Sequence, residues 1–102
     1  MIRETGVFAT PNASRYLQQL CKHFAHKVAV DYDDNTGRAD LPPGPAVMTA
    51  TPKDLTVVVE AVDEDGIALA RHIIDDHLTR FAFREDFSGM GWQPADPGQS
   101  NQ

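Results

Sequence analysis

This chain of 102 residues lacks most of the features by which a sequence reveals an activity or a partner. Its one cysteine excludes an internal disulfide. Nine Lys and Arg stand against fifteen Asp and Glu, and the net charge of −6 disfavours a nucleic-acid backbone or an acidic membrane surface as a partner. No apolar run approaches the roughly 20 residues of a membrane-spanning helix, and the N-terminal residues contain no signal-peptide segment. We therefore expect a cytoplasmic protein.

Catalytic motifs are also missing. No glycine-rich phosphate loop follows a predicted strand, and neither Ser14 nor Ser88 has the surroundings of an activated nucleophile. Cys21 lies on the apolar face of a predicted helix, where burial makes a thiol unreactive. The acidic residues at 63–65 and 75–76 are typical of solvated faces. The sequence therefore predicts a protein that is not an enzyme and that uses no cofactor.

The apolar residues that are present predict two amphipathic helices. The first stripe has helical spacing and consists of Ala13, Leu17, Leu20, Cys21, Phe24 and Val28. The second consists of Ile67, Ala70, Ile73, Ile74, His77, Leu78 and Phe81. Strands are predicted over residues 7–10, 28–32, 38–41, 46–50 and 55–62. Three prolines between positions 42 and 45 predict an edge or a bend there, because proline cannot donate to a strand ladder.

This order of elements, strand, helix, four strands and helix, predicts an α+β fold. We expect an antiparallel sheet of four to five strands with both helices packed on one face. The topology resembles one half of the TATA-binding-protein fold, without its DNA binding because the chain is acidic. Residues 1–92 form one domain in this prediction, and residues 93–102 form a disordered tail. The open sheet face, with residues such as Thr56 and Val58, is expected to be solvated or to make a modest homodimer contact.

His77 is the most informative single residue, since it lies within the second apolar stripe. A buried imidazole needs a hydrogen-bond partner or a cavity in which its chemistry is used. We expect a neutral ring at pH 7 that donates one hydrogen bond. The acceptor is expected to be a backbone carbonyl, the hydroxyl of Tyr16, or His23 on the facing helix.

Basic side chains around His77 predict a pocket for a small anion. The predicted ligand-binding residues are His77, Arg80, Arg84, His23 and Lys27. The planar guanidinium of arginine recognises carboxylate or phosphate groups. The alternative is that Arg80 and Arg84 pair with surface acids such as Asp76 and that His77 is only a core residue.

A transition-metal site is a second hypothesis. Its candidate ligands are His23, His26, His77 and Cys21, and imidazole and thiolate suit zinc or copper. At about 100° per residue, His26 points nearly opposite the apolar face that contains Cys21. The four groups converge only if the helix frays near its end, and otherwise Cys21 and His77 are core residues.

Two segments carry a family resemblance. Residues 16–27 (YLQQLCKHFAHK) and 77–85 (HLTRFAFRE), followed by Trp92, resemble the signature stretches of the bacterial Domain of Unknown Function 2218 family. The resemblance extends over residues 5–92. It implies a binding or accessory domain linked with iron or siderophore handling, because some members occur beside siderophore-interacting flavin reductases. It thus implies a siderophore-like ligand and such a reductase as partner, while a structural dimerisation module is the third alternative.

Overall fold

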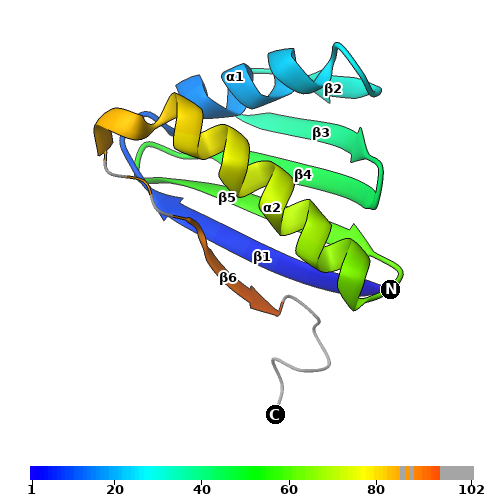
Figure 1. The fold of residues 1–102 in the computed structure, drawn as a ribbon. Helices are drawn as coiled ribbons and strands as arrows, with labels where there is room; N and C mark the ends of the chain where they lie inside the picture. Colours follow the sequence, from blue (N-terminus) through cyan, green and yellow to red (C-terminus); the bar gives the residue numbers. More distant parts are fainter. Residues whose placement is uncertain (86, 88, 95–102) are drawn as a thin grey trace.

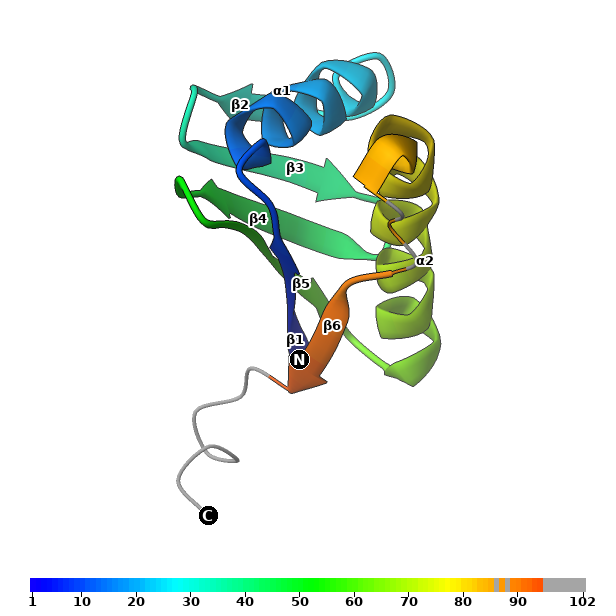
Figure 2. The ribbon, with the colours of Figure 1, turned by 90° about the vertical axis from the view of Figure 1, so that its left-hand side faces the viewer.

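The computed structural model of the protein describes residues 1–85, 87 and 89–94. The elements are β1 (Ile2–Ala9), α1 (Ala13–Phe24), β2 (Val30–Tyr32), β3 (Thr36–Leu41), β4 (Gly44–Ala50), β5 (Asp54–Ala61), α2 (Glu64–Phe81), a 3-10 turn η1 (Phe83–Glu85) and β6 (Gly91–Pro94). The strands form one antiparallel sheet in the order β2-β3-β4-β5-β1-β6. Both helices lie across one face of it (Figure 1), and the view turned by 90° shows α2 beside the sheet and β6 next to β1 (Figure 2). The α+β fold is confirmed.

The sheet has six strands rather than the predicted four to five. The missed strand is β6, which pairs with β1 at the edge of the sheet. Its residues, Gly-Trp-Gln-Pro, contain a single large apolar side chain and no alternation, so no strand pattern exists to detect. Gln93 and Pro94 were expected in the disordered tail and belong to this strand instead. Residues 95–102 of that expected tail lie outside the described part of the chain.

Strand β1 begins at Ile2, earlier than predicted. Its first half was not predicted as strand because it carries polar residues. It pairs along its whole length with β5, from Ile2 opposite Ala61 to Ala9 opposite Asp54. Glu4 points to the helix side and is stabilised there by Arg71 of α2, whose guanidinium lies 2.9 Å from its carboxylate. This pair makes a charged side chain acceptable on the covered face of the sheet.

The proline-rich bend is shorter than predicted. Only Pro42 and Pro43 lie between β3 and β4, and Pro45 is already part of β4, opposite Asp40. Gly44 allows this tight connection: its φ is +157°, and a Cβ there would lie 2.1 Å from the backbone oxygen of Glu60. Only glycine lets the two backbones approach so closely.

The core lies between the helices and the covered sheet face. Leu55, Val57 and Val59 of β5 are fully buried beneath the helices, whereas Val58 points to the open face. From the helices, the buried residues are Ala13, Tyr16, Leu17, Leu20, Cys21, Phe24, Ile67, Ala70, Ile74 and Leu78. The predicted burial is confirmed for most of the stripe residues, but Val28, Ile73, His77 and Phe81 are only partly buried. Neither helix is long and apolar enough to cross a membrane.

Candidate functional site

A pocket of about 210 Å³ opens where the end of α1, the β3–β4 turn and α2 meet. Its lining residues are His23, Phe24, Lys27, Val28, Leu41, Pro42, Ile73 and His77. Five of these are apolar and three carry nitrogen donors or acceptors. Ligand sites in proteins commonly combine apolar walls with a few polar groups that orient the ligand.

His77 is held in place by its own helix. Its Nδ1 lies 2.7 Å from the backbone oxygen of Ile73, one turn earlier. A carbonyl oxygen can only accept, so Nδ1 carries the proton and donates. Of the three acceptors that the sequence analysis considered for His77, the backbone carbonyl is therefore the one that it bonds to. The hydroxyl of Tyr16 donates elsewhere, to Glu85.

His23 on α1 meets His77 across the two helices. Their ring centroids are 4.5 Å apart, with the planes tilted by 55°. The Phe24 ring lies edge-on to His77, at 5.1 Å between centroids. Partial desolvation, followed by repulsion from His77, His26, Lys27 and Arg80, lowers the pKa of His23 below its ordinary value of 6.5. The lowered pKa disfavours the charged form of the His23 ring.

The other two predicted ligand residues, Arg80 and Arg84, do not line this pocket. Arg80 is exposed and pairs with Asp76 at 3.1 Å, one turn earlier on α2. Arg84 lies in η1, beyond the end of α2, with its guanidinium carbon 5.5 Å from the centre of the Phe83 ring. Helical spacing would place Arg84 one turn beyond Arg80, but α2 ends at Phe81 and the chain turns away. The structure thus brings three of the five predicted residues together.

The candidate metal ligands do not form one site. Among residues 1–85, 87 and 89–94, no group of three or more His, Cys, Asp or Glu side chains has metal-site geometry. Cys21 is fully buried, and a Cβ on Gly37 of β3 would lie 2.7 Å from its sulfur. Burial raises the pKa of the Cys21 thiol to about 11. His26 is exposed in the turn after α1, so only His23 and His77 of the four lie in contact.

Sequence analysis missed a second polar cluster, which is centred on Glu85. The Glu85 carboxylate accepts hydrogen bonds from Thr10 Oγ1 at 2.7 Å, from Asn12 Nδ2 at 2.9 Å and from the Tyr16 hydroxyl. These hydrogen bonds lower the pKa of Glu85, and the bond from Tyr16 has the largest effect. The pKa of Tyr16 is raised, mainly by burial and to a smaller extent by the nearby Glu85 carboxylate. The cluster joins η1 to the start of α1, beside a more polar pocket of about 300 Å³ that Arg15 and Arg84 also line.

The only sequence signal for this cluster is weak. Tyr16 and Glu85 stand at the beginning and the end of the two family segments, but they are 69 residues apart. No periodic pattern connects residues at that separation, so the pair is visible only after folding.

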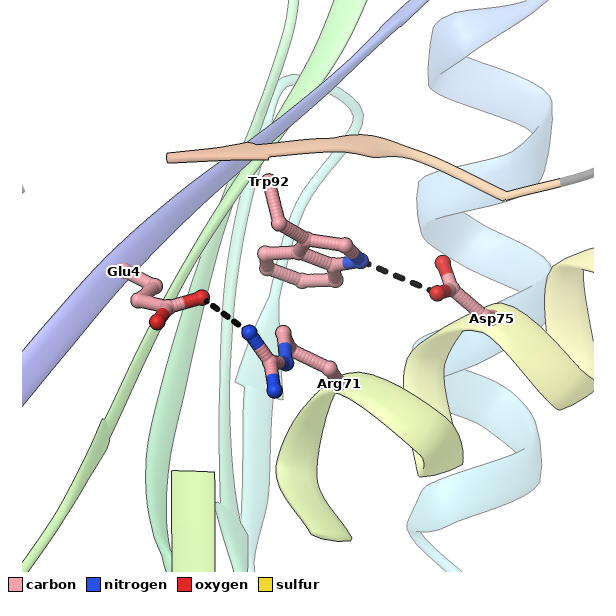
Figure 3. A network of polar contacts seen from close by, with 4 residues as sticks. All are labelled: Glu4, Arg71, Asp75 and Trp92. Carbon is pink, nitrogen blue, oxygen red and sulfur yellow. Dashed lines mark hydrogen bonds and ion pairs between the residues drawn. The ribbon is translucent and has the colours of Figure 1, made fainter. Parts of the chain in front are cut away.

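Trp92 is docked on the domain, as its apolar character predicts. Its indole Nε1 donates to Asp75 Oδ2 at 2.9 Å, next to the ion pair between Arg71 and Glu4 (Figure 3). The ring packs on Gly6 of β1, where a Cβ would lie 2.8 Å from two of its carbons. This contact places β6 against β1 and α2.

The fold and the pocket define a small α+β domain with a one-sided helical layer and no recognisable catalytic motif in the described residues. Residues 5–93 match the model of a family described as an uncharacterized protein conserved in bacteria, DUF2218, and the chain belongs to that family. It is similar to the protein in the NMR structure of PA4090 from Pseudomonas aeruginosa, with 33% identity and a TM-score of 0.77. That similarity covers 94% of this chain and 99% of the other. No curated protein is similar to it at a significant level.

Proposed function

We propose that this chain is a non-catalytic binding domain whose pocket between α1 and α2 holds a small anionic ligand. The observation that carries the proposal is the meeting of His23, Lys27 and His77 around an otherwise apolar pocket. On a chain with a net charge of −6, a lysine beside an apolar pocket gives an anion one local point of attraction. Among the described residues, the pocket lining contains two imidazoles and an ammonium but no hydroxyl or thiol that could serve as a nucleophile.

The family resemblance suggests the kind of ligand. We propose a siderophore-like molecule, with a siderophore-interacting flavin reductase as the partner that supplies or receives it. The pocket, at about 210 Å³, is smaller than the roughly 300–1,000 Å³ of sites for drug-sized ligands. Only one ring or one short arm of such a molecule would therefore enter, and the remainder would lie outside.

A titration with a small aromatic anion tests this proposal. We expect 2,3-dihydroxybenzoate to shift the amide and side-chain NMR signals of the pocket residues, and Lys27→Gln to weaken this binding. Lys53→Gln is the matched control, since Lys53 is exposed in the β4–β5 turn. Absence of shifts at millimolar ligand, or equal effects of the two lysine variants, would contradict the proposal.

A thermal-shift measurement with metal ions and with the aromatic anion distinguishes metal binding from anion binding. His23 and His77 alone would supply a two-ligand site, and zinc prefers four ligands. If Zn²⁺ or Cu²⁺ raises the melting temperature and a chelator reverses the effect, while the aromatic anion has none, the metal hypothesis replaces the anion pocket.

The open sheet face favours a second function, homodimerisation. Its middle is uncharged: Thr5, Val58 and Val47 lie side by side on neighbouring strands, as do Val7, Thr56 and Thr49. Val7 and Val47 are 44% and 42% exposed. The flanks carry the ion pairs Arg3–Glu60 and Arg38–Asp40, each neutral in sum. The other carboxylates on this face, Asp31 opposite Arg38 and Asp54 at the start of β5, lie at its edges, so a contact between two copies would be centred on uncharged residues.

Sedimentation measures this alternative directly. We expect the wild-type chain to sediment as a dimer at micromolar concentration and Val47→Glu to sediment as a monomer, because a charge would be buried in the contact. Leu69→Glu, which is on the outer side of α2, is the control. A wild-type monomer at 100 μM would contradict the dimer.

A further inference from the structure

The tautomer of His77 limits which groups a ligand can present to it. Nδ1 donates to the backbone oxygen of Ile73 at 2.7 Å. In a neutral imidazole the other nitrogen, Nε2, then has a lone pair and can only accept. The carbonyl of Ile73 therefore accepts the hydrogen bond from Nδ1 and leaves Nε2 as the ring nitrogen that a ligand can meet.

Nε2 of His77 has no hydrogen-bond partner within the described part of the chain. No side-chain nitrogen or oxygen of the described residues is buried without a partner. The hydrogen bonds of the described residues engage His77 only through Nδ1. Nε2 must consequently reach solvent, and His77 is one of the residues that line the pocket.

The neighbouring groups complete a mixed set of donors and acceptors. His23 adds a second imidazole ring, 4.5 Å away between centroids, and its lowered pKa favours the form that has an acceptor nitrogen. Lys27 is the only cation in the lining and only donates. A plain carboxylate brings acceptors alone, so it would pair with Lys27 and leave the imidazole nitrogens without a donor.

We propose that the pocket takes a single-ring hydroxylated aromatic acid, whose phenolic O–H donates to Nε2 of His77 and whose carboxylate pairs with Lys27. The ring contacts the apolar walls, among them Phe24 and Ile73. The size agrees, because an apolar cavity of about 150 Å³ holds benzene and this pocket has about 210 Å³ for one ring with its substituents. The inference rests on the proposed binding function and narrows its ligand class.

Matched ligands test the donor requirement without any mutation. The probes are 3- and 4-hydroxybenzoate, their methyl ethers and benzoate, each titrated by NMR into the full chain. The ethers keep the ring, the charge and the oxygen but cannot donate. We expect the better hydroxybenzoate to bind about three- to tenfold more tightly than its ether and than benzoate, the contribution of one hydrogen bond.

Two variants assign the effect to residues. His77→Phe keeps a ring in the same place, and we expect it to abolish the preference for the hydroxyl while benzoate still binds. Lys27→Gln should weaken all the probes by a similar factor, and Lys53→Gln should change none. If all the probes bind the wild-type pocket equally well, this inference is overturned and the anion site stands. If none of them binds, the proposed function itself fails.

Discussion

The indole N–H of Trp92 donates a hydrogen bond of 2.9 Å to the carboxylate of Asp75, and this joins the last described strand to the middle of α2 (Figure 3). The other oxygen of the same carboxylate accepts from the backbone N–H of Met90 at 3.1 Å. The side chain of Asp75 thus bonds both to the backbone just before β6 and to the Trp92 side chain within β6.

Asp75→Ala should lower the free energy of unfolding by about 1–3 kcal/mol, because it leaves the partly buried indole donor without its charged acceptor. Asp76→Ala is the control: Asp76 makes only a partly exposed ion pair with Arg80, worth about 0–1 kcal/mol. Urea denaturation measures both values. Equal losses for the two variants would show that the bond to Trp92 contributes no stability.

Gly6→Ala should displace Trp92, because the added Cβ would lie 2.8 Å from two carbons of the indole. Overpacking of this kind costs about 1–3 kcal/mol. Tryptophan fluorescence should shift to longer wavelength as the ring leaves its site. Gly91→Ala on the neighbouring strand is the control, since its nearest contact, the Val7 oxygen, would be at 3.9 Å. An unchanged spectrum in Gly6→Ala would contradict the packing.

Glu85 should contribute to acid sensitivity. Its pKa in the folded chain is lowered from the ordinary 4.5 by the bonds from Tyr16, Asn12 and Thr10. A group with a lowered folded pKa stabilises the fold above its unfolded pKa, and this stability is lost as the pH falls toward the folded value. Glu85→Gln should therefore flatten the decline of stability below the ordinary pKa of 4.5.

Urea denaturation at a series of pH values from neutral to acid measures this slope. Tyr16→Phe should flatten the decline in part, because Tyr16 is the largest cause of the lowered pKa. Asp31→Asn, at an exposed position on β2, is the control. A slope in Glu85→Gln equal to that of the wild type would argue against the cluster.

The Cys21 thiol should be inert in the folded chain. It is fully buried and its pKa is raised to about 11, so almost no thiolate exists at pH 8. Alkylation by iodoacetamide should proceed only in denaturant. In a Cys21→Ala background, Ala25→Cys at the exposed end of α1 should react within minutes. Rapid labelling of native Cys21 would contradict its burial.

Sequence patterns predicted the regular elements best where hydrophobic periodicity is uninterrupted. The stripe between Ile67 and Phe81 predicted most of α2, and the alternation along Leu55 to Val62 predicted β5. Hydrophobic periodicity failed to predict a strand where the strand depends on a side chain from another part of the chain. Glu4 is tolerated in β1 because of Arg71, and β6 is held through Trp92 by Asp75.

The candidate site was likewise predicted only in part. The sequence marked His77 as a residue in need of a partner, and it proposed His23 and Lys27 opposite. Nothing in the spacing tells that α2 ends at Phe81, so that Arg80 meets Asp76 and Arg84 turns to Phe83.

By itself, the sequence determined the family, the two amphipathic helices, most of the strands and the acidic charge, because periodicity, composition and motif are properties of neighbouring residues. Only the tertiary structure decided which of the basic residues share a pocket and that Tyr16 and Glu85 meet across 69 residues. Those relationships depend on where helices end and how they cross the sheet. Packing of the whole chain sets these distances, and no local pattern encodes them.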